Sequence, residues 1–253
     1  MNRILDHKIG IHNNLKKEKG DFLGLVSINN ANPTNLSKAK AYLKHYESFE
    51  ANPIYLDSSK YYLDKLLIEK SFHLYIQYYY LKHNYNEIIS LEMQYSDKNF
   101  FGNNKEERSL CLSRIAESYA LRDMDGKALS YYKEANKLSP YYLDIKIKLG
   151  IQLLKMQKIL AAKNQFSHII EEYPEYKEAY CNLGYLAILD NNFKLADSYL
   201  NKAIHLDPDY VQAYENLVLS AQIQNKIEQA KVYLNKILEI APEHKAKEIL
   251  SKL

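Results

Sequence analysis

Small and large apolar residues recur at a fixed distance along the second half of the chain. The small residues are four alanines, 34 positions apart, at Ala128, Ala162, Ala196 and Ala230. A large apolar residue follows each alanine four positions later, at Tyr132, Phe166, Leu200 and Leu234. Positions four apart lie on the same face of an α-helix, so each segment is predicted to be a helix with one apolar face.

A second helix is predicted ahead of each of these helices. There, 12 to 13 positions before the alanine, a large apolar residue precedes a small or slim one, at Ile115-Ala116, Leu149-Gly150, Leu183-Gly184 and Leu217-Val218. Polar turns lie between the two helices, at residues 123–125, 157–158, 190–192 and 224–226. Prolines 140, 174, 208 and 242 end the later helix, because proline lacks an N–H group and keeps the preceding residue extended. The pattern predicts antiparallel helix pairs in close contact.

This 34-residue pattern resembles the tetratricopeptide repeat, whose copies carry Leu-Gly in the first helix, Ala and an aromatic residue in the second, and a closing proline. In the best copy, residues 178–208, the matching positions are Tyr180, Leu183, Gly184, Ala196, Leu200, Ala203 and Pro208. Four copies start near Ser109, Leu143, Lys177 and Val211 and cover residues 109–242. The resemblance implies an all-α, right-handed superhelical solenoid of antiparallel helix pairs, with N-terminal helices and a C-terminal capping helix.

The pattern is weaker before the four repeats. Residues 1–58 are expected to form an N-terminal helical cap region, with helices near residues 1–17 and 34–49 and an extended stretch near residues 22–28. Residues 59–108 are interpreted as a degenerate repeat followed by an insertion, with Ile88 in the position that alanine fills later. The tyrosine run at residues 78–80 would suit either a binding surface or packing, and packing is favoured.

The end of the chain, residues 243–253, is predicted to be a capping helix. Ala246, Ile249, Leu250 and Leu253 are at helical spacing, with lysine and glutamate between them. Such a helix would cover the exposed apolar face of the last repeat.

Composition supports a helical protein and excludes several classes. Only 7 Gly and 6 Pro occur in 253 residues, too few for the turns of an all-β sandwich or barrel. The 34 Lys and Arg against 31 Asp and Glu give a net charge of +3, and the interleaved charges form no nucleic-acid footprint. No apolar run approaches the roughly 20 residues that span a bilayer, and no signal peptide is evident. Two cysteines exclude a disulfide framework, so we expect a cytoplasmic protein without membrane insertion.

Recognisable catalytic and metal-binding motifs are missing from the sequence. The eight histidines show no paired ligand spacing, and no GxGxxG, GxxxxGK[ST] or GxSxG pattern occurs. Cys181 has no neighbour in sequence that would lower the pKa of its thiol, so a packing or groove role is favoured. We therefore expect no enzyme activity, no catalytic residues, no metal and no cofactor.

What the resemblance implies instead is binding of another protein or peptide in a groove lined by the first helices of the pairs. The groove residues predicted from the family's positions are Ile147, Ile151, Leu154, Cys181, Tyr185, Ile188, Leu219, Glu178 and Glu215. This set is apolar with an acidic edge, which disfavours the carboxylate-gripping function of chaperone-binding members. Two structural alternatives stay open: the C-terminal helix fills the groove, or superhelical twist makes some of these residues core.

The leading hypothesis is a non-catalytic scaffold or adaptor that binds a partner peptide or helix in the apolar groove. A second hypothesis is a peptide-sensing regulatory protein whose N-terminal helices act on a partner or on DNA. A third is an accessory subunit of an enzyme complex, such as a transferase, with the chemistry on another chain. Short peptides would suffice as ligands under the second hypothesis, and a catalytic chain would co-purify under the third.

Overall fold

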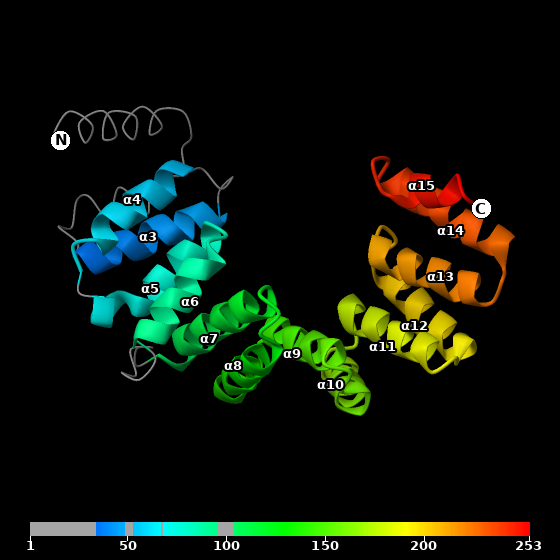
Figure 1. Ribbon diagram of the computed structural model, residues 1–253, viewed down its shortest axis with the longest axis horizontal. Helices are drawn as coiled ribbons and strands as arrows, with labels where there is room; N and C mark the ends of the chain where they lie inside the picture. Colours follow the sequence, from blue (N-terminus) through cyan, green and yellow to red (C-terminus); the bar gives the residue numbers. More distant parts are fainter. Residues whose placement is uncertain (1–33, 49–52, 67, 96–103) are drawn as a thin grey trace. The chain divides into compact units, whose positions relative to one another are not determined.

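The computed structural model describes residues 34–48, 53–66, 68–95 and 104–253, apart from the side chains of residues 68–70. The chain divides into two compact units, Met1–Ser118 (unit 1) and Tyr119–Leu253 (unit 2). The described residues form thirteen helices, α3 to α15, and contain no strand (Figure 1). The predicted all-α architecture of helix pairs is confirmed. The features predicted before residue 34, and the insertion up to residue 103, lie outside the described residues.

Unit 2 reproduces the 34-residue period of the sequence in its helix boundaries. Its helices are α8 (Asp125–Leu138), α9 (Leu143–Lys155), α10 (Ile159–Glu172), α11 (Lys177–Leu189), α12 (Phe193–Leu206), α13 (Val211–Ile223), α14 (Ile227–Ile240) and α15 (Ala246–Leu250). Each helix packs against the next along the chain, and α11 also contacts α9 and α13. As predicted, prolines 140, 174, 208 and 242 follow the ends of α8, α10, α12 and α14.

The turns inside the pairs share one backbone conformation. Asp123, Gln157, Asn191 and Asn225 all have φ between 55° and 56°, in the left-handed region that asparagine and aspartate tolerate better than most residues. The next residue donates its N–H to a carbonyl five positions back, as Asn192 does to Ala187 at 2.8 Å. This bond satisfies a carbonyl at the end of the first helix, so the turn both stops that helix and directs the chain into the second.

The close approach of paired helices depends on glycine. A Cβ atom at Gly184 would lie 2.6 Å from Cγ of Leu200, and one at Gly150 would lie 2.5 Å from Cε1 of Phe166. The side chain over Gly184 is Leu200, and the Ala196 carbonyl oxygen lies 3.5 Å from the same Cβ position. The large residue one turn after the alanine therefore fills the space, while the alanine brings the backbones together.

The C-terminal end of unit 2 is closed by the short helix α15. Ala246 is fully buried and belongs to the same apolar cluster as Leu234 and Ile237 of α14. Ile249 and Leu250 pack against this cluster while staying partly exposed. Three of the four residues at helical spacing thus pack against the cluster, whereas Leu253 follows the end of α15 and is exposed.

Unit 1 contains two helix pairs and most of a further helix. Its helices are α3 (Asn35–Ser48), α4 (Pro53–Leu63), α5 (Ile68–Leu81), α6 (Tyr85–Tyr95) and α7 (Lys105–Ala120), the last of which ends two residues past the unit boundary. The α5–α6 turn repeats the geometry of unit 2, with His83 at φ 54° and a bond from Asn84 N to the Tyr79 carbonyl. The expected division at residue 59 falls inside α4.

The core of unit 1 is built mainly of leucine and isoleucine side chains, with tyrosines among them. Of the tyrosine run, Tyr78 is buried, as the packing interpretation expects, whereas Tyr79 and Tyr80 are only partly buried. Ile88 is buried in the position of the later alanines. The Tyr42 and Tyr62 rings stack with centroids 5.7 Å apart across α3 and α4. Unit 1 therefore combines aromatic packing with an aliphatic core.

Polar side chains join the first helices of unit 1. Lys40 of α3 donates to Glu107 of α7 at 2.8 Å, and His73 Nε2 of α5 lies 3.6 Å from the same carboxylate. A second ion pair joins the same two helices seven residues further along each: Arg114 of α7 pairs with Glu47 of α3 at 3.1 Å. The Lys40 hydrogen bond lowers the pKa of Glu107, and burial lowers the pKa of His73. Two ion pairs therefore link α3 to α7, while the two buried ring nitrogens of His73 between them lack a hydrogen-bond partner among the described residues.

Candidate functional site

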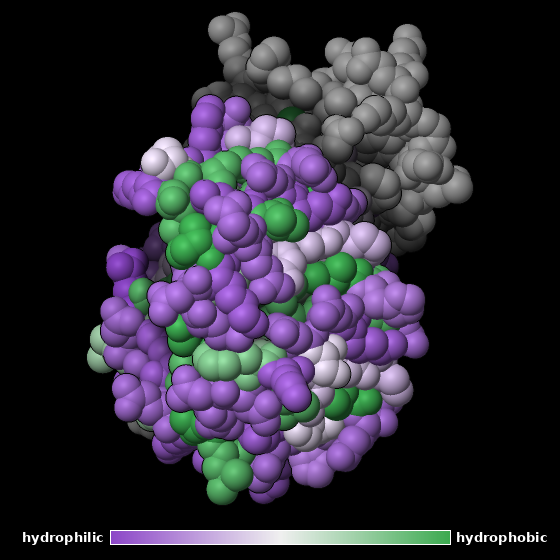
Figure 2. Space-filling view, turned by 90° about the vertical axis from the view of Figure 1, so that its right-hand side faces the viewer, coloured by the Kyte–Doolittle hydropathy of each residue, from purple (hydrophilic) through white to green (hydrophobic). Residues whose placement is uncertain are grey.

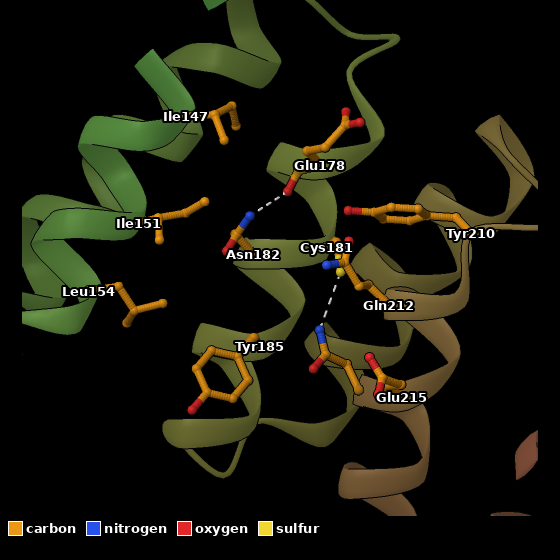
Figure 3. A pocket seen from close by; sticks show the side chains of 11 residues that line it. Ile147, Ile151, Leu154, Glu178, Cys181, Asn182, Tyr185, Tyr210, Gln212 and Glu215 are labelled. Carbon is orange, nitrogen blue, oxygen red and sulfur yellow. Dashed lines mark hydrogen bonds between the residues drawn. The ribbon is translucent and has the colours of Figure 1, made fainter. Parts of the chain in front are cut away.

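A cavity of about 350 Å³ opens between the first helices of unit 2 (Figure 3). Its lining residues come from α9, α11 and the start of α13: Ile147, Ile151, Leu154, Glu178, Cys181, Asn182, Tyr185, Tyr210, Gln212, Glu215 and Asn216. The volume lies at the small end of the range for ligand pockets and is about twice that of a cavity that holds benzene. It suits one or two side chains of a bound segment.

One wall of the cavity is an apolar row on α9. Ile147, Ile151 and Leu154 are spaced i, i+4, i+7 and so lie on one helix face. The opposite face, with Ile145, Leu149 and Leu153, is buried in the core. Ile151 is 46% exposed, and Figure 3 shows its side chain extending toward α11. Because α9 is apolar on both faces, it supplies the core and the cavity wall at once.

The facing wall is a mixed row on α11. Glu178, Asn182 and Tyr185 have the same i, i+4, i+7 spacing, and Figure 3 places Asn182 between the other two. Asn182 donates from Nδ2 to the Glu178 carbonyl at 2.7 Å, which fixes the orientation of the amide. This wall presents a carboxylate, an amide oxygen and an aromatic ring to the cavity.

The α13 end of the cavity is polar around a buried thiol. Asn216 donates from Nδ2 to Cys181 Sγ at 3.2 Å. Burial raises the pKa of Cys181 to about 11, and burial beside Cys181 also raises the pKa of Tyr210. Both groups are therefore neutral at physiological pH, and neither is an activated nucleophile.

The C-terminal segment reaches the rim of the cavity at Glu215. His244 Nε2 lies 3.3 Å and Lys245 Nζ lies 3.1 Å from Oε1 of that carboxylate. Helix α15 itself packs on α14. The chain thus neutralises one acidic group of the rim while the rows on α9 and α11 face each other across the cavity.

The structure brings together seven of the nine residues predicted for the groove. The other two lie outside the cavity: Ile188 is 1% exposed in the core, and Leu219 packs against the core cluster of α13. For Ile188 the alternative of a core position is the observed one. Their binding role, like that of the seven, stays a prediction.

Four lining residues lie outside the set predicted for the groove: Asn182, Tyr210, Gln212 and Asn216. Three of them follow the same period. Asn182 and Asn216 are 34 residues apart, and Tyr210 occupies the position before the first helix, as Tyr142 and Tyr176 do in earlier repeats. Comparing polar residues between copies would have found them.

Other sites are not evident among the described residues. No group of three or more His, Cys, Asp and Glu side chains there is arranged to hold a metal ion. None of the helices described is long and apolar enough to cross a membrane. On the face that Figure 2 shows, hydrophobic groups lie scattered among hydrophilic ones, the pattern of an ordinary protein surface.

A model of the tetratricopeptide repeat family matches residues 177–210 and 211–244. The chain contains tetratricopeptide repeats. The two matches start at Lys177 and Val211, where the third and fourth copies were predicted to begin, and the cavity lies partly within them. No curated protein sequence matches the chain.

Solved structures share the tetratricopeptide fold at low sequence identity. MamA from Desulfovibrio magneticus is 17% identical with a TM-score of 0.56, over 70% of this chain and 97% of that one. YrrB, described as a protein with these repeats and an unusual peptide-binding site, is 18% identical with a TM-score of 0.52, over 85% and 100%. PilW, described as a type IV pilus biogenesis factor, is 17% identical with a TM-score of 0.56, over 72% and 80%. At these identities the likeness establishes the fold alone.

Proposed function

We propose that this protein is a non-catalytic adaptor that binds a segment of another protein in the cavity between α9 and α11. Solenoids of stacked helix pairs offer extended surfaces for protein binding, and tetratricopeptide repeats are such a solenoid. The observation that carries the proposal is the apolar row on α9, with Ile151 exposed at its centre, facing Tyr185 across a cavity of side-chain size. Aromatic and aliphatic residues on rigid helices commonly dominate interface energies.

The chemistry of the cavity supports binding rather than catalysis. Its thiol is held protonated, because burial raises the pKa of Cys181 to about 11. YrrB, which shares the fold, is described as having a peptide-binding site, and a peptide ligand suits the cavity of this chain as well. The proposed adaptor role therefore rests on the cavity, on its protonated thiol and on the peptide-binding site described for YrrB.

Selection from a display library of random peptides, on the immobilised full chain, tests this function. Peptides that bind through the cavity should lose binding to a double variant, Ile151→Glu with Tyr185→Glu. The matched control is Leu160→Glu with Val232→Glu, because these residues are 73% and 64% exposed on second helices and do not line the cavity. The proposal fails if no selected peptide discriminates between the two double variants.

A further inference from the structure

We propose that the cavity recognises an arginine next to an apolar residue of the bound segment, with Glu178 pairing with the guanidinium group. This inference rests on the proposed function and names the chemistry of its ligand. The apolar residue packs on Ile151 of the α9 row, and the arginine lies along the α11 row.

The lining of the cavity is rich in hydrogen-bond acceptors. Its eleven residues include two carboxylates and no lysine, arginine or histidine. Asn182 and Asn216 each use an N–H of the amide within the protein, on the Glu178 carbonyl and on Cys181 Sγ, and each amide also carries an acceptor oxygen. A ligand that supplies several donors and a positive charge complements this surface.

Glu178 differs from the neighbouring acidic groups in having its charge available. Glu215 pairs with His244 and Lys245, and Asp144 pairs with Lys148 at 3.0 Å. Within the described residues Glu178 has no ion-pair partner. Its neighbour in sequence, Lys177, pairs with Asp207 and lies over the Tyr210 ring, and its charge acts on Glu178 only from beyond ion-pair distance. The cation for Glu178 is therefore left for a partner to supply.

The row on α11 suits arginine better than lysine. Glu178, Asn182 and Tyr185 present a carboxylate, an amide oxygen and an aromatic ring in succession along one helix face (Figure 3). A guanidinium group has five N–H donors in a plane, so it can bond the Glu178 carboxylate and the Asn182 amide oxygen, one helical turn apart, at the same time, which an ammonium group does less well. Its aliphatic stem would lie against the apolar α9 row, as long cationic side chains do on apolar surfaces.

The test begins with the peptides selected on the full chain that do not bind the Ile151→Glu, Tyr185→Glu variant. We expect arginine beside a large apolar residue to be enriched among them. Glu178→Gln should weaken binding of such a peptide about tenfold, the size expected for one charge-assisted hydrogen bond. Glu175→Gln makes the same charge change at an exposed residue outside the cavity and should leave affinity unchanged.

A neutral analogue of the peptide separates recognition from any effect on folding. Citrulline in place of the arginine should weaken binding to the wild-type chain about tenfold and make no further difference to the Glu178→Gln variant. Cavity-dependent peptides without arginine, or equal affinities for wild type and Glu178→Gln, would overturn this proposal and leave peptide binding intact. A selection that yields no cavity-dependent peptide would instead overturn the proposed function, and this proposal with it.

Discussion

The first helices of the two units use the same kind of helix face in different ways. In unit 1, Lys40, Glu107, Arg114 and Glu47 meet across the helices, and His73 lies beside Glu107. In unit 2, the corresponding helices α9 and α11 place an apolar row opposite a mixed one and leave a cavity between them. In unit 1, oppositely charged side chains pair with each other across the helices. In unit 2, the facing rows do not pair, and the space between them is open to a ligand.

The cores of the two units also differ in the residues that pack in them. Unit 2 pairs small residues with large ones at each repeat, as Gly184 with Leu200 and Gly150 with Phe166. Unit 1 adds stacked tyrosines, such as Tyr42 on Tyr62, and ion pairs between helices to a core of leucine and isoleucine. Four predictions about stability test this comparison.

The largest effect is expected from the packed core of unit 2. Phe166→Ala removes a fully buried ring that lies against Gly150 and should destabilise the chain by about 3–5 kcal/mol, since a cavity replaces the ring. Leu160→Ala on the same helix, at a residue 73% exposed, should change stability by less than about 0.5 kcal/mol. Urea unfolding monitored by circular dichroism measures both, and equal effects would contradict the packing described for α9 and α10.

A smaller loss is expected where glycine permits close approach. Gly184→Ala places a methyl group against Leu200 Cγ and should cost about 1–3 kcal/mol through overpacking. Gly126→Ala is the matched control, because a Cβ there meets nothing within 4 Å and alanine favours the helix by about 0.5–1 kcal/mol. Opposite shifts of the urea midpoint are expected, and a neutral Gly184→Ala would mean that α11 and α12 pack less closely.

Unit 1 should respond to acid through His73. Burial lowers the pKa of this histidine in the folded chain below its ordinary value of 6.5, against the opposing effect of Glu107 and with Lys40 and Arg114 nearby. The unfolded chain therefore binds a proton more readily, so stability falls as pH drops below about 6.5 toward the lowered pKa.

His73→Leu removes this titration and should flatten the stability profile over that range of pH. Unfolding curves at successive pH values measure the slope. His168→Leu is the control, because His168 is exposed in unit 2 and should leave the slope as in wild type. An unchanged slope in His73→Leu would rule out His73 as its source.

The smallest stability effect is expected at the open face of unit 2. Ile151→Glu with Tyr185→Glu changes two residues that line the cavity, with Ile151 46% exposed, so the melting temperature should stay within a few degrees of wild type. Differential scanning calorimetry checks this. A large drop in the melting temperature would show that these side chains belong to the core, as Ile188 does.

Much of the fold of unit 2 could be predicted because one pattern repeats within it. The alanines, prolines and polar turns at 34-residue steps locate the helix pairs, and the observed helices keep that step. In unit 1 the long tyrosine-rich segments lack such punctuation, so the predicted boundary at residue 59 falls inside α4. Periodicity constrains a sequence only where several copies agree on the register.

The candidate site was predictable as a helix face but not as a cavity. Ile147, Ile151 and Leu154 follow from helical spacing, and so does Ile188, which is nevertheless buried. Spacing gives the direction of a side chain from its own helix and says nothing about how close the neighbouring helix comes. The contacts of Asn182 and Asn216 with the Glu178 carbonyl and Cys181 likewise depend on the packed helices.

In unit 2 the sequence by itself determined where helices begin and end, which residues are small enough to bring them together, and that the repeats stack. These are local or periodic properties, set by backbone propensity and by spacing along one helix. The tertiary structure alone decided that Leu200 covers Gly184, that Leu219 and Ile188 leave the groove, and that Glu178 keeps its charge unpaired while Glu215 does not. Each of these outcomes depends on distances between helices, which the packing of the whole unit sets.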